Sequence, residues 1–143
     1  MRTVREIPDG GCETDATKLR LIREHIVQNL SYDGDLAVDV RPGWAPDLDA
    51  IYGNRDSAKK SICFGLTALF NAMLRSVGVP AMLVMGYVKT PAAKTPLYHA
   101  YSKVYHSGKW ERVDITFEMT NRQNMSIMAF IADDNYYHDL FLF

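Results

Sequence analysis

The sequence lacks any hydrophobic run long enough to cross a membrane, because no stretch approaches the roughly 20 apolar residues that a transmembrane helix needs. It also lacks an excess of charge of either sign: 16 lysines and arginines are interspersed with 17 aspartates and glutamates. A strongly basic patch is typical of proteins that bind nucleic acids or anionic membranes. We therefore expect no nucleic-acid partner and no membrane insertion. No apolar signal core follows Met1, which leaves the compartment open, and export or display on the cell surface would fit a trimmed signal.

Cysteine and histidine are scarce, with two and four residues respectively. Cys12 lies in a glycine-rich leader and Cys63 in a hydrophobic run, so we predict two free thiols with different roles rather than one disulfide. The spacing of His25, His106 and His138 is not typical of a metal site, and we interpret these three as surface residues. We expect no metal and no other cofactor.

The length of 143 residues and the 48% hydrophobic composition fit one domain with one buried core. Residues 1–13 contain proline and glycine without periodicity, so we predict a loose leader there. A single domain is then expected over residues 14–143.

The first predicted helix begins at Thr14 or Asp15, either of which is a suitable N-cap, and runs up to residues 31–34, with apolar side chains at helical spacing from Leu19 to Leu30. The following stretch, residues 34–60, is rich in proline and glycine. It predicts a long connection with a short helix near residues 46–52.

Cys63 falls at the start of the next predicted helix. Ser61 is a good N-cap, apolar residues follow at helical spacing to Val77, and Gly78 and Pro80 are typical of a helix end. Only the thiolate of a cysteine is a good nucleophile, and an ordinary thiol has a pKa near about 8.5. Unpaired N–H groups and the dipole at a helix start stabilise an anion there, and the same N–H groups can donate to an oxyanion.

Strands are predicted on both sides of a flexible stretch. The apolar run of residues 81–88 predicts a buried strand, and the aromatic and β-branched residues of 97–105 and 109–117 predict a β-hairpin. The apolar tail, residues 135–143, predicts a last strand.

The hairpin gives a geometric reason to pair His99 with Asp114. If residues 107–108 form a two-residue turn, Tyr101 lies opposite Asp114. His99 then lies opposite Thr116, which makes His99 and Asp114 diagonal neighbours about 7 Å apart between backbones. A carboxylate so placed would orient a histidine base. A three-residue loop with a bulge would instead put Asp114 on the opposite face, and the sequence leaves both loops open.

These segments resemble the motifs of the bacterial transglutaminase-like superfamily: residues 61–80 (SICFGLTALFNAMLRSVGVP) with 85–88 (MGYV), residues 98–105 (YHAYSKVY) and residues 108–116 (GKWERVDIT). The similarity covers roughly residues 15–117. It implies an α+β fold with a papain-like, transglutaminase-like core, in which the nucleophile helix packs against an antiparallel β-sheet. It also implies a catalytic triad of Cys63, His99 and Asp114.

The activity implied by this resemblance is cysteine-dependent acyl transfer or hydrolysis at amide bonds, of the protease, amidase or transglutaminase type, through a thioester. The substrate would be a protein or a peptide. Neither its identity, the choice between water and an amine as acceptor, nor the oligomeric state follows from the sequence.

Two positions depart from the family pattern: Ser61 replaces a usual glycine, and Ile115 replaces a usual proline. The alternative is therefore a catalytically inactive module that binds a peptide or a glycan, which Ser61 favours and an intact triad argues against. Some relatives take a second oxyanion donor from an upstream Trp, Tyr or Gln, and Trp44 and Tyr52 are the candidates in this chain.

Overall fold

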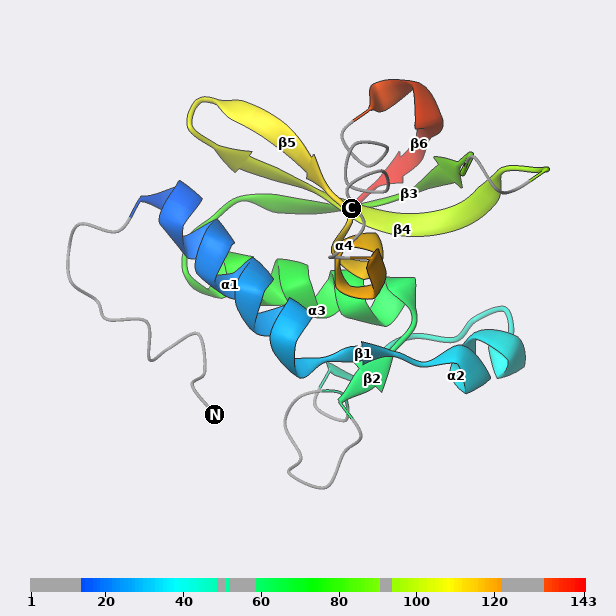
Figure 1. Ribbon diagram of the computed structural model, residues 1–143. Coiled ribbons are helices and arrows are strands. Elements are labelled where there is room, and N and C mark those ends of the chain that lie inside the picture. Colours follow the sequence, from blue (N-terminus) through cyan, green and yellow to red (C-terminus); the bar gives the residue numbers. More distant parts are fainter. Residues whose placement is uncertain (1–13, 49–50, 52–58, 91–93, 122–132) are drawn as a thin grey trace.

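The structure is a computed structural model that describes residues 14–48, 51, 59–90, 94–121 and 133–143. Its helices and strands follow in the order α1 (Asp15–Asn29), β1 (Ser31–Tyr32), α2 (Gly34–Asp39), β2 (Lys60–Ser61), α3 (Cys63–Ser76), β3 (Ala81–Val88), β4 (Leu97–His106), β5 (Lys109–Val113), α4 (Ile115–Asn121), the 3-10 helix η3 (Asp134–Tyr136) and β6 (Tyr137–Leu142). Figure 1 shows their arrangement in space.

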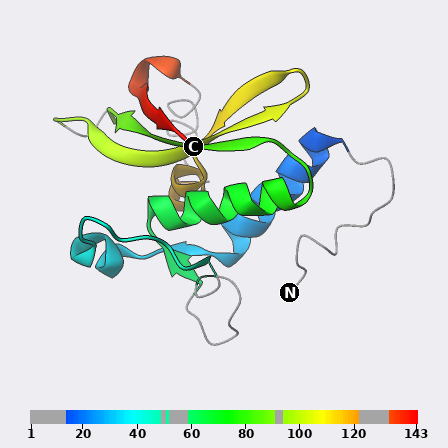
Figure 2. The same cartoon turned by 180° about the vertical axis from the view of Figure 1, so that it is seen from behind.

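An antiparallel sheet with the strand order β5-β4-β3-β6 forms one layer, and α1, α3 and α4 lie together on one side of it, with α3 packed directly against the sheet (Figure 1). Figure 2 shows from behind that α3 runs along this side of the sheet. The predicted α+β class, with the helix of Cys63 packed against an antiparallel sheet, is confirmed. Strands β1 and β2 form a separate parallel pair at the far side of the helices.

The main core lies between the helices and the sheet. Apolar side chains from the helices, the sheet strands and the segments between them fill it: Leu19, Ile22, Ile26, Leu30, Ile51, Leu66, Leu69, Phe70, Met73, Leu74, Val79, Ala81, Val104, Val113 and Ile115. Burying such side chains provides roughly 1.5–3 kcal/mol each before conformational entropy is subtracted. Within the described residues, none of the helices combines the length and the apolar composition that a membrane span requires.

The helix α1 confirms the first helical prediction. The Thr14 side chain accepts a hydrogen bond from the Thr17 N–H at 3.2 Å, which makes Thr14 the N-cap. The spacing of its apolar residues places Leu19, Ile22 and Ile26 in the core. The helix α2 was not predicted; its N-cap is Asp33, whose carboxylate accepts from the Leu36 N–H at 3.0 Å. Of the predicted short helix near residues 46–52, the structure describes residues 46–48 and 51, and the Ile51 N–H donates to the Asp47 carbonyl at 3.1 Å, a helical spacing. The predicted leader, residues 1–13, lies wholly outside the described residues.

The prediction that Ser61 caps α3 is wrong. The N-cap is Ile62, which makes no side-chain capping bond, and Ser61 belongs to β2, paired with Tyr32 of β1. The Ser61 side chain lies instead over Gly65, where an added Cβ would stand 2.0 Å from the Ser61 Oγ. The predicted helix end is confirmed: Gly78 has a φ of +82° just after the C-cap, a conformation that glycine adopts without steric cost.

The two-residue turn predicted for the hairpin is confirmed. Ser107 and Gly108 have φ values of +53° and +80°, and His106 pairs with Lys109. The second strand, however, ends at Val113 rather than at residue 117, so the predicted pairings of residues 101 with 114 and 99 with 116 do not form.

The strand stops because the next residue, Asp114, begins a helix. Its Oδ1 accepts from the Phe117 N–H at 3.1 Å and its carbonyl accepts from the Glu118 N–H at 3.0 Å, the pattern of an N-cap. The propensity of the β-branched residues that follow is overridden by this cap.

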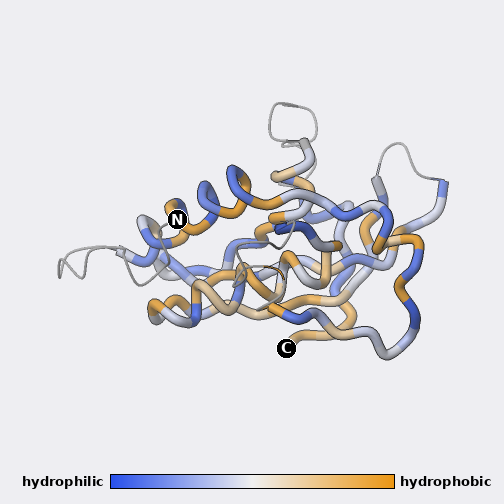
Figure 3. The backbone as a smooth tube through the Cα atoms, turned by 90° about the horizontal axis from the view of Figure 1, so that it is seen from below, coloured by the Kyte–Doolittle hydropathy of each residue, from blue (hydrophilic) through white to orange (hydrophobic). Residues whose placement is uncertain are grey.

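The predicted last strand is confirmed as β6, which runs antiparallel to β3 and forms an edge of the sheet. Its register shifts at a bulge between Met85 and Gly86. A Cβ at Gly86 would lie 2.3 Å from the His138 carbonyl oxygen, so glycine is what allows β6 to approach β3 there. Figure 3 shows the hydrophobic colouring of the chain end near the C-terminus, and its residues Phe141 and Leu142 are exposed.

Candidate active site

Cys63 is the first residue of α3, and its thiol is free and partly exposed. Burial alone would raise the pKa of the Cys63 thiol, but the proximity and the positive charge of His99, together with the backbone of Ala100, lower this pKa below its ordinary value. The thiolate is therefore the favoured form of Cys63 at a lower pH than in a free cysteine.

His99 lies on β4 with its Nε2 2.8 Å from Oδ2 of Asp114. Because Nε2 faces the carboxylate, the other ring nitrogen, Nδ1, is left to face the sulfur of Cys63. Burial alone would lower the pKa of His99. The Asp114 carboxylate and the nearby Cys63 sulfur outweigh the effect of burial and raise this pKa to about 10. The ring of Phe117 stacks on the imidazole with centroids 4.5 Å apart, which fixes its plane.

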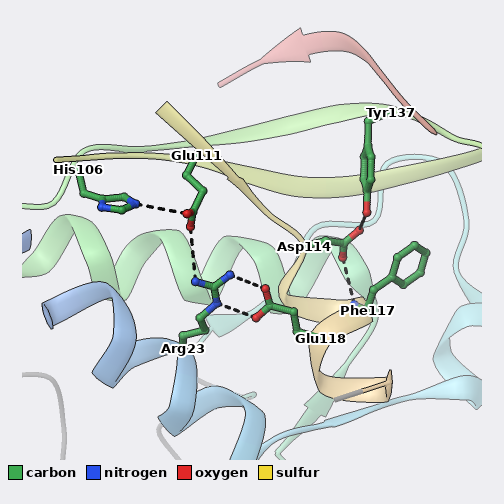
Figure 4. Close-up of polar contacts among 7 residues, drawn as sticks. All are labelled: Arg23, His106, Glu111, Asp114, Phe117, Glu118 and Tyr137. Atoms are coloured by element: carbon green, nitrogen blue, oxygen red, sulfur yellow. Dashed lines mark hydrogen bonds and ion pairs between the residues drawn. The ribbon is translucent and has the colours of Figure 1, made fainter. Parts of the chain in front are cut away.

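Asp114 is fully buried at the start of α4, where three donors surround its carboxylate. The Phe117 N–H donates to Oδ1, and the hydroxyl of Tyr137 donates to Oδ2 at 2.8 Å (Figure 4). A buried carboxylate needs such donors to remain charged. Of the three site residues named from the sequence, the structure therefore joins His99 to Asp114 directly, and His99 lies near enough to Cys63 for its charge to lower the pKa of the thiol.

Tyr137 was missed by the reasoning from sequence. It is 9% exposed, lies on β6 and reaches Asp114 from a strand that is distant in the chain. One feature of the sequence could have indicated it: a tyrosine within an apolar tail. When a tyrosine is buried, its hydroxyl usually needs a hydrogen-bond partner.

A second network flanks the first. The Tyr101 hydroxyl donates to the Asp139 carboxylate, which also pairs with Lys103. Tyr101 is fully buried and its ring meets the edge of Tyr137 with centroids 4.9 Å apart. This network anchors β6 to β4 across β3 beside the candidate site.

The two residues considered as second oxyanion donors have different outcomes. Trp44 packs edge-on against Phe64, the neighbour of Cys63, with ring centroids 6.1 Å apart, so it lies near the start of α3. Among the described residues, its indole N–H makes no hydrogen bond that would indicate a donor role. Tyr52 lies outside the described residues. A pocket of about 240 Å³ opens beside Trp44 and is lined by Leu36, Trp44, Ala45, Asp47, Ile51, Lys59, Lys60 and Ser61.

The other histidines are not all surface residues. His138 is exposed, but His25 is half-buried, and the His106 side chain is 13% exposed with its Nε2 3.6 Å from Glu111 (Figure 4). That prediction is wrong for His106, because its side chain folds back along the hairpin onto Glu111. Among the described residues, no three histidine, cysteine or acidic side chains gather as metal ligands would. Cys12 lies outside the described residues.

The comparisons with known proteins bear on the family and the fold. The family model of the transglutaminase-like superfamily core matches residues 2–115. One similar solved structure, described as a TGase, is 21% identical, with a TM-score of 0.56 over 79% of this chain and 29% of that one. Another, described as a "putative cysteine protease" from Cytophaga hutchinsonii, is 19% identical, with a TM-score of 0.61 over 94% of this chain and 38% of that one.

At these identities the two solved structures show a shared fold alone. The chain spans about a third of the length of each of these two proteins. None of the proteins of curated function matches it.

Proposed function

Because the chain belongs to the transglutaminase-like superfamily, we propose that Cys63, His99 and Asp114 form a catalytic triad for cysteine-dependent acyl transfer or hydrolysis at amide bonds. The observation that supports the proposal is the contact of the His99 imidazole with the buried carboxylate of Asp114, beside a thiol at a helix start whose pKa His99 lowers. A lone buried cysteine would need neither partner. The expected substrate is a protein or a peptide, without nucleic acid or membrane insertion.

In the first half-reaction the Cys63 thiolate attacks the amide carbonyl carbon, and the carbonyl oxygen becomes an oxyanion. The His99 imidazolium then gives its proton to the nitrogen of the departing amine as the C–N bond breaks, which leaves a thioester on Cys63. Asp114 does not take the proton; it keeps the imidazolium oriented and stabilises its charge.

In the second half-reaction water or an amine attacks the thioester carbon while His99 takes its proton. The C–S bond breaks, the acid or the new amide leaves, and the thiolate and imidazolium return. The protein is unchanged after the cycle, and no outside oxidant or reductant is required.

The start of α3 suits the oxyanion. The first N–H groups of a helix have no intrahelical acceptor, and here the N-cap residue Ile62 makes no side-chain capping bond that would occupy them. They are therefore available as donors beside Cys63, aligned with the positive end of the helix dipole.

A test should detect the covalent intermediate as well as turnover. The protein is incubated with dimethylcasein and a fluorescent primary amine, and separately with fluorescein-labelled casein alone, so that amine incorporation and proteolysis are both measured. We expect one of the two signals, with an acyl adduct on the Cys63 peptide in mass spectrometry after an acid quench.

Two variants complete the test. Cys63→Ser should abolish signal and adduct, whereas Cys12→Ser should retain both. A wild-type protein that binds casein or a glycan array without any adduct or product would overturn the proposal in favour of the non-catalytic module.

A further inference from the structure

The last strand, β6, delivers a hydroxyl to the carboxylate of Asp114. Tyr137 is the first residue of this strand, and its hydroxyl donates to Oδ2 (Figure 4). The same oxygen lies 2.8 Å from Nε2 of His99. The other oxygen, Oδ1, is held by the Phe117 N–H at 3.1 Å. Each carboxylate oxygen therefore has its own fixed donor. The group cannot turn about its Cβ–Cγ bond without losing a hydrogen bond in a buried site.

The ring of Tyr137 is itself held from both sides. The guanidinium carbon of Arg112 lies 4.0 Å from the ring centroid, and the ring of Tyr101 meets it at an angle of 75°. In the sheet, Tyr137 of β6 pairs with Val88 of β3. Burial and the negative charge of Asp114 raise the pKa of Tyr137 above its ordinary value, so the hydroxyl keeps its proton and remains a donor.

We propose that Tyr137 is a positioning residue of the site: its hydroxyl orients Asp114, and Asp114 in turn holds the His99 ring so that Nδ1 faces Cys63. The inference deepens the proposed function and rests on it. The hydroxyl of Tyr137 donates to Asp114, so Asp114 is the group through which it reaches His99. A purely structural tyrosine would affect stability without affecting the reactivity of Cys63.

The first experiment measures alkylation of Cys63 by iodoacetamide at pH 6 in the Cys12→Ser background. Tyr137→Phe removes only the hydroxyl, and we expect the rate to fall about fivefold, the size of effect that one ordinary hydrogen bond provides. The matched control is Tyr101→Phe, which removes a buried hydroxyl from the same cluster. That hydroxyl donates to Asp139 rather than to Asp114. We expect Tyr101→Phe to lower the melting temperature and to leave the rate unchanged.

The second experiment asks whether Tyr137 acts through the carboxylate. In an Asp114→Asn background, adding Tyr137→Phe should change the alkylation rate by less than about twofold, because neighbours in one network are not additive. A Tyr137→Phe protein that alkylates like the wild type would overturn the inference. An unchanged fivefold loss in the Asp114→Asn background would overturn it equally.

A third readout does not depend on cysteine chemistry. The Nε2 proton of His99, hydrogen-bonded to Asp114, should give a low-field proton resonance in the wild type and in Tyr101→Phe. In Tyr137→Phe we expect this resonance to move or to broaden through faster exchange with water. If casein shows neither adduct nor product, the proposed function fails while this comparison still decides the role of Tyr137, and identical spectra would refute that role.

Discussion

The imidazole of His99 and the carboxylate of Asp114 form a buried pair, with Nε2 2.8 Å from Oδ2 and exposed fractions of 6% and 0% for the two residues. In such surroundings a charge-assisted hydrogen bond is stronger than it is in water. The pair therefore favours the imidazolium, and the positive charge beside Cys63 favours the thiolate. The ionisation of Cys63 and that of His99 are therefore linked.

The pH dependence of Cys63 alkylation follows from this linkage. The pKa of Cys63 is lowered and that of His99 is raised to about 10, so an imidazolium–thiolate pair should persist across neutral pH. An ordinary thiol, with a pKa near 8.5, reacts about two orders of magnitude more slowly at pH 6 than at pH 8. For Cys63 we expect a drop several times smaller, measured as second-order rate constants with iodoacetamide.

The control for this profile is Asp114→Asn in the Cys12→Ser background. Asparagine keeps the shape of the side chain but lacks the charge that supports the imidazolium. The alkylation rate of Cys63 should then depend on pH as steeply as that of an ordinary thiol. A wild-type profile with a midpoint near 8.5 would contradict the expectation.

The contact between His99 and Asp114 could be predicted, but only partly for the right reason. The two-residue turn fixed the register of the hairpin, and the register brought the two side chains near each other. Asp114 reaches His99 from the N-cap of a helix, however, and not from a strand. Strand propensity in residues 115–117 could not indicate this, because a single capping side chain decides where the strand ends.

The surroundings of Cys63 could not be predicted from local patterns. Ser61 lies in a strand of two residues, too short for any periodicity, and its pairing partner belongs to a segment almost thirty positions earlier. Tyr137 reaches Asp114 only because β6 pairs with β3 past a bulge. Such contacts depend on long-range register, which no local spacing in the sequence reports.

Stability should depend on pH through His99. The imidazole has a pKa near 6.5 in an unfolded chain but about 10 in the folded protein, so the folded state binds the extra proton between these values. The stability from this group is fully present below about pH 6.5 and is lost as the pH rises through 10. Because the pKa of Cys63 is lowered in the folded protein, its contribution to stability changes with pH in the opposite direction, and Cys63→Ala removes that contribution.

We therefore expect the melting temperature of Cys63→Ala to fall between pH 6.5 and pH 10, with Asp114 still raising the pKa of His99. The matched control is the double variant Cys63→Ala/His99→Gln, in which this part of the slope should disappear. Parallel melting curves for the two proteins over that range would show that His99 binds no extra proton on folding.

Arg23 of α1 holds α4, the helix that Asp114 caps. Its Nε and Nη2 donate to the two carboxylate oxygens of Glu118 at 2.8 Å and 2.6 Å, and Glu118 is almost fully buried (Figure 4). Arg23→Met would leave that buried carboxylate without its cation. Because the arginine is partly exposed, we expect a cost of about 2 kcal/mol, below the range for a fully buried pair. Urea unfolding measures this cost.

The comparison variant is Arg23→Met/Glu118→Leu, which removes both charges and restores apolar packing between α1 and α4. It should regain most of the lost free energy of unfolding, since replacing a buried ion pair by apolar groups is often neutral. A double variant that is less stable than Arg23→Met would mean that Glu118 contributes through its other contacts.

At Gly65, a position inside α3, replacement by alanine should destabilise the protein rather than stabilise it. Within a helix, alanine is normally more stable than glycine by about 1 kcal/mol. A Cβ at Gly65, however, would stand 2.0 Å from the Ser61 Oγ and 3.2 Å from the Ile51 Cδ1. We expect Gly65→Ala to destabilise the protein by about 1–3 kcal/mol through overpacking, and to slow alkylation of Cys63 by shifting the start of α3.

The rescue variant isolates the cause. Ser61→Gly removes the side chain that the new methyl group would meet, so Ser61→Gly/Gly65→Ala should recover the melting temperature and the alkylation rate. Ser61→Gly alone also removes a buried hydroxyl that has no hydrogen-bond partner within the described part of the chain, and it should leave the rate unchanged. If the double variant stayed as unstable as Gly65→Ala, the contact between Ser61 and Gly65 would not be what excludes a larger residue at this position.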